Sequence, residues 1–130
     1  SYKKLFWEMI MNNQDLFFSD SDLDLKENLV VIPNALTKVG LITGYTYDWK
    51  EKAVERSRYN TKNFNFVGES DTGVIAQDVE LLGLPGITTT RDSGTKAVKY
   101  ERLVPVLIEA IKELKTEITS LKARVTTLEG

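Results

Sequence analysis

An apolar repeat in the last quarter of the chain constrains the fold more than any other feature of the sequence. Apolar residues recur there with the spacing 3-4-3-4-3-4-3, at Val104, Leu107, Ile111, Leu114, Ile118, Leu121, Val125 and Leu128. We call this row the seam. Its spacing is typical of a helix that joins other helices in a coiled coil. A single helix this polar beyond residue 112 has too little apolar surface to bury, so the sequence predicts an oligomer.

Charged residues beside the seam indicate parallel helices. With Ile111 at heptad position a, Glu117 falls at position g and Lys122 at the following position e; Arg124 and Glu129 repeat this relation. In a parallel coiled coil, such g and e residues of neighbouring chains face each other. β-branched residues at a with Leu at d favour two strands in model peptides, so the pattern alone does not predict a trimer. The alternative is one amphipathic helix that packs on its own domain.

Upstream of residue 104 the sequence predicts an α+β fold, a small globular head with short strands and helices. The expected elements are a short strand before Pro33, a helix that ends at Gly40, a strand over 41–49, a surface loop over 50–72, and a buried strand with a short helix over 73–86. A turn and a brief strand precede the long helix. The expected domains are residues 1–20, a head over 21–103, and a coiled-coil helix over 104–130.

The first twenty residues differ from the rest of the chain. Their hydropathy alternates weakly at Leu5, Trp7, Met9 and Met11, as in a strand. Such a segment carries aromatic surface with little to cover it. We expect it to be the end of a longer polypeptide that precedes the head.

Composition excludes several classes of function. The chain has no Cys and no His, so it cannot build a disulfide, a thiolate zinc site or a Ser-His-Asp triad from its own residues. No metal site is expected. A net charge of −2 offers no basic excess for nucleic acid. No apolar run approaches the roughly 18 residues that a membrane span needs, so no membrane partner is expected.

The stretch FFSDSDLDLKEN, residues 17–28, has three interpretations. Asp20, Asp22 and Asp24 alternate like the first ligands of an EF-hand calcium loop. The sixth and twelfth positions of such a loop require Gly and Glu, and here they hold Leu25 and Val31. The second interpretation is a solvated acidic turn. The third is a site at which the chain cleaves itself.

Self-cleavage requires a base that activates a serine. Because the chain has no His, a lysine amine is the remaining well-attested partner, and Lys26 lies five residues after Ser21. The amine must first lose its proton. The apolar neighbours Leu23, Leu25 and Leu29 would favour the neutral amine by excluding water.

Four blocks of sequence carry a resemblance to a known family: SDLDLKENL, ALTKVGLITGYTYDW, GVIAQDVE and VKYERLVPVLIEAIKELK. In this order they resemble the C-terminal intramolecular chaperone, or auto-processing, domain of tailed-phage tail spikes, tail fibres and neck appendages. The resemblance runs from Ser21 to about Lys122. The opening motif of the family, Ser-Asp-x-Arg-x-Lys, falls on Ser21, Asp22 and Lys26. This chain departs from the motif at Asp24, where the family has arginine.

The resemblance implies a homotrimer at the C-terminus of a β-helical fibre, whose own fibre portion is its partner. Such a domain aligns three chains, assists their folding, and then releases itself as a serine endopeptidase that acts once, in cis or between subunits. The scissile bond would be Asp20–Ser21. Ser21 would attack the carbonyl carbon of Asp20, Lys26 would accept the proton, and water would hydrolyse the resulting ester. Asp22 and Asp24 are candidate supporting acids.

The resemblance also carries expectations about cofactors and location. No cofactor is required, although some members of the family use ATP in release. The precursor would belong to the virion tail, would assemble in the host cytoplasm, and would lose this domain before the particle matures. The alternative is a purely structural trimerisation tip that is never cut.

Overall fold

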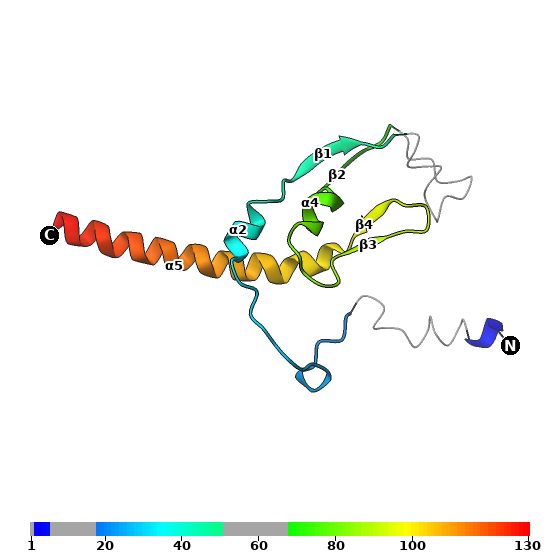
Figure 1. Cartoon of the computed structure of the whole chain (residues 1–130), viewed down its shortest axis with the longest axis horizontal. Coiled ribbons are helices and arrows are strands. Elements are labelled where there is room, and N and C mark those ends of the chain that lie inside the picture. Colours follow the sequence, from blue (N-terminus) through cyan, green and yellow to red (C-terminus); the bar gives the residue numbers. More distant parts are fainter. Residues whose placement is uncertain (1, 6–17, 51–67) are drawn as a thin grey trace. The chain divides into compact units, whose positions relative to one another are not determined.

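The long helix predicted from the heptad repeat is present in the computed structural model of the chain (Figure 1). It is α5, Val104–Glu129, and Pro105 lies in its first turn, where the missing N–H costs nothing. The structure describes residues 2–5, 18–50 and 68–130. Short strands and short helices upstream of α5 make the fold α+β, as predicted.

The chain divides into two compact units, residues 1–31 and 32–130. In the first, residues 2–5 are helical and Leu23–Leu25 form a 3-10 turn, η1. The second contains α2 (Ala35–Val39), β1 (Tyr45–Asp48), β2 (Ser70–Gly73), α4 (Ala76–Glu80), β3 (Thr88–Thr90), β4 (Lys96–Val98), the 3-10 turn η2 (Tyr100–Leu103) and α5. The domain boundaries expected at residues 20 and 103 stay predictions.

Four strands form two small antiparallel sheets. β1 pairs with β2, with Tyr45 opposite Gly73, and β3 pairs with β4, with Thr88 opposite Val98. Two-stranded sheets of this size are marginal by themselves, so they depend on packing against helices. A 2.5 Å ion pair between Lys96 of β4 and Glu80 of α4 joins one sheet to its neighbouring helix.

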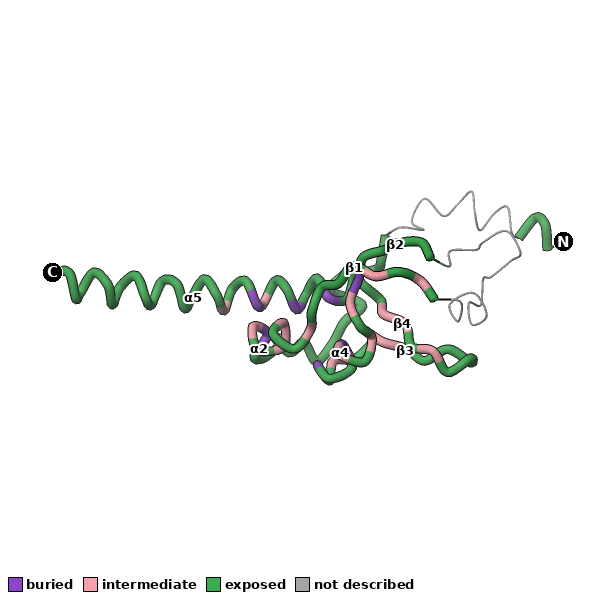
Figure 2. The backbone as a smooth tube through the Cα atoms, turned by 90° about the horizontal axis from the view of Figure 1, so that it is seen from above, coloured by how far each residue is buried: buried purple, intermediate pink, exposed green. Residues whose placement is uncertain are grey.

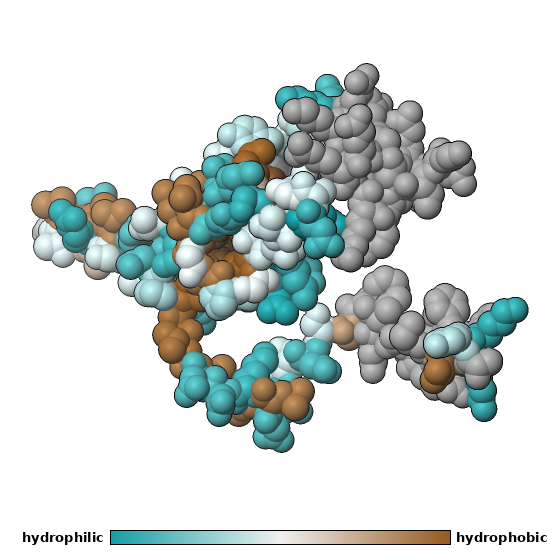
Figure 3. Space-filling view, turned by 45° about the vertical axis from the view of Figure 1, so that its right-hand side comes forward, coloured by the Kyte–Doolittle hydropathy of each residue, from teal (hydrophilic) through white to brown (hydrophobic). Residues whose placement is uncertain are grey.

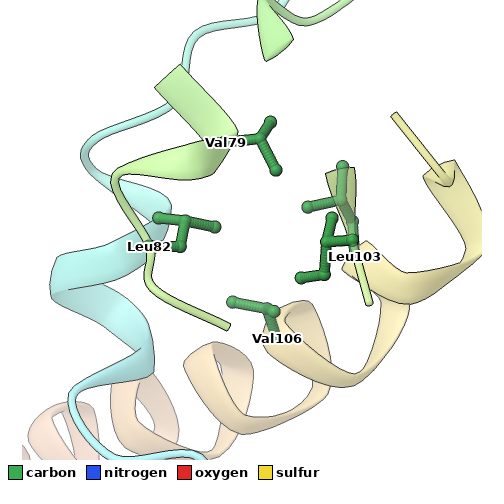
Figure 4. Close-up of a cluster of buried hydrophobic side chains, with 5 residues drawn as sticks. Val79, Leu82, Leu103 and Val106 are labelled. Carbon is green, nitrogen blue, oxygen red and sulfur yellow. The ribbon is translucent and has the colours of Figure 1, made fainter. Parts of the chain in front are cut away.

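The core lies where α4 and the segment after it meet the start of α5. Its buried side chains are Val79, Leu82, Ile87, Leu103 and Val106 (Figure 4). Burial of apolar side chains supplies most of the free energy that holds such a body together. Figure 2 shows that the buried positions of α5 fall in its first turns and that the C-terminal half of the helix is exposed.

The first turns of α5 have one face buried against the body and another face exposed. Val106 and Ala110 are buried towards the body, and α2 packs on this part of the helix. Val104 and Leu107, the first two seam residues, are 51% and 43% exposed. The seam therefore begins beside the body rather than beyond it.

Two hydrogen bonds between residues that are distant in the sequence hold α2 and the end of β2 in place. The Glu113 carboxylate of α5 accepts a 2.8 Å hydrogen bond from the Leu36 N–H in the first turn of α2. The Tyr100 hydroxyl accepts a 3.1 Å hydrogen bond from the Val74 N–H, just after β2. Both contacts satisfy backbone N–H groups at the ends of elements.

Some predicted elements are wrong. Residues 29–32 form no strand, since no described strand pairs with them. The predicted loop over 50–72 contains the strand β2, which pairs with β1 although its sequence, SDTG, is polar and gives no strand signal. Residues 51–67 of that loop lie outside the described residues. The predicted strand over 41–49 is limited to β1.

The strand predicted from the alternating hydropathy of the first twenty residues is also wrong where the structure describes it, because Leu5 lies in a helical turn. Trp7, Met9 and Met11 lie outside the described residues. β3 is an element without a signal in the hydropathy pattern. Its three threonines pair with β4 through backbone hydrogen bonds that hydropathy does not show.

Candidate active site

Ser21 and Lys26, the two residues predicted to react together, are in contact. Lys26 Nζ donates a 2.7 Å hydrogen bond to Ser21 Oγ. That distance is within the range expected between a nucleophile and its base. An amine far from the hydroxyl would have removed the proposed chemistry, and the two groups instead meet within one short segment.

The turn η1 brings the two side chains together. The N–H of Leu25 donates to the Asp22 carbonyl, and the N–H of Lys26 donates to the Leu23 carbonyl, both at 3.1 Å. These i to i+3 bonds reverse the chain direction over a single turn. In an extended chain, residues five positions apart lie on opposite faces and roughly 17 Å apart, so without the turn Lys26 could not reach Ser21.

Asp22 opens this turn. Its Oδ1 accepts a 2.9 Å hydrogen bond from the Asp24 N–H, so Asp22 acts as an N-cap. The cap is a role of Asp22 beyond that of a candidate supporting acid. Its sequence signal is the residue type, because Asp is among the preferred N-cap residues.

The side chain of Asp24 is exposed and makes no hydrogen bond or ion pair with any other described residue. Its role as a supporting acid stays a prediction. Asp20, whose carbonyl would be attacked, is exposed as well. Among the described residues, no group of three or more acids is arranged to hold a metal ion, so the calcium-loop interpretation gains no support.

The apolar screen predicted around Lys26 is not formed within one chain. Leu23, Leu25 and Leu29 are each 68% exposed, and Val30 and Val31 are more exposed still. The prediction of burial was wrong for the isolated chain because the turn is too short to cover itself. These leucines and valines leave an apolar surface near Ser21 and Lys26 that is uncovered among the described residues.

The seam is a second uncovered apolar surface. Beyond the body its residues are 43% to 84% exposed: Ile111, Leu114, Ile118, Leu121, Val125 and Leu128. Figure 3 shows brown surface on the face of α5 that it presents. A row of exposed apolar side chains this long marks an interaction surface. This exposure is consistent with the predicted coiled coil, which stays a prediction.

Tyrosines gather beside β2 in the second unit. Tyr47 packs edge-on against Trp49, and the hydroxyls of Tyr47 and Tyr100 both lie near Gly73. Burial raises the pKa of Tyr47, and the nearby Asp71 carboxylate and Tyr100 raise it further. These contacts hold the β1–β2 sheet.

Comparisons with known proteins identify relatives of the chain. The sequence model of the family Peptidase_S74, described as "Chaperone of endosialidase", matches residues 21–85, so the match begins at Ser21. The chain is 29% identical over 112 residues to the "Long tail fiber protein Gp37" of Enterobacteria phage K3 and to the protein of the same name of Enterobacteria phage T2. The matched part is 81% of this chain but only 8% and 7% of those proteins.

The chain thus spans less than a tenth of the length of these curated relatives. Within the part of the chain that the structure describes, no helix is both long and apolar enough to cross a membrane.

Proposed function

This chain belongs to the chaperone-of-endosialidase family, and from that membership we propose that it is the C-terminal intramolecular chaperone of a phage tail fibre. The similarity to long tail fibre proteins supports the tail fibre as its partner. In this proposal the domain assembles as a homotrimer, aligns the three fibre chains, and then releases itself by cutting its backbone between Asp20 and Ser21.

One observation carries the self-cleavage: the 2.7 Å contact between Lys26 Nζ and Ser21 Oγ at the first residue of the family match. A serine hydroxyl is a weak nucleophile until a base removes its proton. The chain has no His, so the amine of Lys26 is the base within reach. The peptide carbonyl of Asp20 directly precedes Ser21 and is the carbonyl that Ser21 Oγ can attack through a five-membered ring.

The proposed reaction balances with the groups at hand. The neutral Lys26 amine takes the hydroxyl proton as Ser21 Oγ bonds to the carbonyl carbon of Asp20. The bond from that carbon to the Ser21 nitrogen then breaks, and the nitrogen receives the proton from Lys26. The product is an ester between Asp20 and Ser21 Oγ. Water hydrolyses this ester, so the reaction requires no cofactor.

Assembly would favour this reaction. Only a neutral amine accepts a proton, and exclusion of water favours the neutral form. Leu23 and Leu25 flank the contact and are uncovered in one chain. If neighbouring chains covered these leucines, water would be excluded from the contact between Ser21 and Lys26. Cleavage would then follow assembly rather than precede it.

The trimer explains how the domain assists folding. A fibre of intertwined chains forms from contacts that are distant in sequence and between molecules, which makes alignment entropically costly. The exposed seam of α5 would join three chains and raise the local concentration of the segments that must intertwine. Release afterwards would leave the fibre kinetically trapped. The precursor would assemble in the host cytoplasm, and the mature virion tail would lack the domain.

The test is to express a precursor that includes the preceding fibre segment and to sequence any new N-terminus. We expect a fragment that begins at Ser21 in the wild type and in Ser19→Ala, a control on a neighbouring exposed serine. Ser21→Ala and Lys26→Ala should stay intact. Cutting that persists in Ser21→Ala rules out the serine mechanism. If every variant, including the wild type, is trimeric and intact, the domain is a structural trimerisation tip.

The oligomeric state has its own test by light scattering. The wild type should have the mass of three chains. Leu121→Lys places a charge in the seam far from the body and should give single chains that remain folded. Thr119→Lys, on α5 but outside the seam, should remain trimeric. A wild-type mass of one or two chains contradicts the proposal.

A further inference from the structure

The apolar chemistry of the seam repeats and does not itself specify how three copies align. Position a is β-branched in every heptad, at Val104, Ile111, Ile118 and Val125, and position d is always leucine, at Leu107, Leu114, Leu121 and Leu128. A chain displaced by one heptad therefore finds the same kind of partner in each layer that it keeps. Only the layers at the ends are lost.

The charges beside the seam do not repeat in this way. Position g holds Glu117 and then Arg124, while position e holds Lys122 and then Glu129. The sign at each position thus reverses between these two heptads, while Lys115, at the preceding position e, has the same sign as Lys122. Glu117, Lys122, Arg124 and Glu129 are exposed, and none of their side chains forms an ion pair with another described residue of its own chain. By contrast, Lys112 pairs with Glu109 on the same helix.

Only one alignment of parallel copies satisfies these charges. In register, Glu117 faces Lys122 of the neighbouring chain and Arg124 faces its Glu129. When one chain slips by a heptad, Glu117 faces Glu129 on one side and Arg124 faces Lys122 on the other. The slip gains one favourable contact, between Glu117 and Lys115, against these two repulsive ones.

We propose that the sign reversal along α5 selects the in-register alignment of three copies of this chain. The inference rests on the proposed trimer and adds what the seam cannot supply. A slip of one heptad displaces a chain by about 10 Å along the helix axis. Each fibre segment begins before the domain, so such a slip would deliver the three segments out of line at the point where they must intertwine.

The decisive variant exchanges the two charges at position e, as Lys122→Glu with Glu129→Lys. Composition, net charge and seam are unchanged. In register, the Glu117 carboxylate then meets the introduced carboxylate and the Arg124 guanidinium meets the introduced amine, so both contacts are repulsive. After a slip of one heptad, the same two residues face opposite charges. A matched control adds the exchange at position g, Glu117→Arg with Arg124→Glu, which restores attraction in register.

The readout is the distance between spin labels on a single introduced cysteine, Thr126→Cys, on the outer face of α5 in the full chain. The natural sequence has no cysteine, so labelling is specific. The wild type should give one short distance. The exchange at position e should add a population displaced by about 10 Å along the axis, and the fourfold variant should return to the single short distance.

Light scattering on the same samples separates this inference from the proposed function. A wild type that is not trimeric defeats the trimer proposal itself. A trimeric wild type whose short distance persists unchanged in the exchange at position e overturns the register inference, because the ends of the seam or the bodies then set the alignment. Loss of the trimer in that variant, with recovery in the fourfold variant, supports the inference; loss in both overturns it.

Discussion

Glu113 and Leu36 lie 77 positions apart in the sequence, and the carboxylate of the first accepts the backbone N–H of the second at 2.8 Å. α2 is preceded by Asn34, whose side chain forms no cap and whose φ is 52°, in the left-handed region that asparagine tolerates. The cap of α2 is therefore supplied by another helix. This hydrogen bond fixes the first turn of α2 on α5.

Removing this cap should destabilise the body. Glu113→Ala leaves the Leu36 N–H without its charged acceptor and should lower the free energy of unfolding by about 1–2 kcal/mol. Urea unfolding at fixed protein concentration measures the change. Glu101→Gln, at a more exposed carboxylate that lies 3.8 Å from Lys99, should change the free energy by only a few tenths of a kcal/mol. Equal effects of the two substitutions would show that the cap contributes nothing.

Gly73 should not tolerate a side chain. A methyl group there would overlap the Tyr100 hydroxyl and lie 3.3 Å from that of Tyr47. Gly73→Ala must displace Tyr100 and break its hydrogen bond from Val74, so we expect a loss of about 2 kcal/mol in unfolding free energy.

Gly44→Ala is the matched control for Gly73→Ala. A methyl group at this position meets no atom within 4 Å. Its free energy of unfolding should equal that of the wild type to within about 0.5 kcal/mol. A Gly73→Ala protein as stable as the Gly44→Ala protein would mean that Tyr100 does not hold β2.

Asp22 should affect cleavage through the turn rather than as an acid. Asp22→Ala removes the cap of η1 and should slow release of the Ser21 fragment several-fold, because Lys26 is then held less well. Asp22→Asn keeps an oxygen that accepts the Asp24 N–H and should cut at nearly the wild-type rate. Time courses on gels give the rates. Asp22→Asn as slow as Asp22→Ala would instead assign the carboxylate a chemical role.

Stability should depend on Tyr47 at high pH. The folded chain raises the pKa of Tyr47 above 10.0, chiefly by burial, so the unfolded chain ionises first as the pH rises. The contribution of Tyr47 is therefore complete below pH 10 and is lost as the pH rises through the folded pKa. Tyr47→Phe should lose less stability than the wild type in alkaline urea titrations. Tyr45→Phe, at a more exposed tyrosine two positions earlier in the same strand, should follow the wild type.

The sequence predicted the elements whose signals are local. α5 follows from a heptad repeat within one continuous segment, and the end of α2 follows from Gly40. The contact between Ser21 and Lys26 also depends only on residues within a single turn. Each of these features requires no knowledge of how distant segments meet.

Features that depend on distant segments escaped prediction. β2 is polar and acquires its strand conformation by pairing with β1, more than twenty residues earlier. Nothing in the sequence around Glu113 indicates that its carboxylate caps a helix 77 positions earlier in the chain. Leu23 and Leu25 are apolar, but apolar character does not reveal which partner covers them, and within one chain nothing described does.

The position of η1 relative to the proposed cut decides which product inherits the reactive groups. The turn, its Asp22 cap and the Ser21–Lys26 contact all lie on the C-terminal side of the Asp20–Ser21 bond. Severing that bond would send the nucleophile and its base away with the discarded piece. The finished fibre would end in an inert carboxylate, with no means to repeat the reaction during the life of the particle.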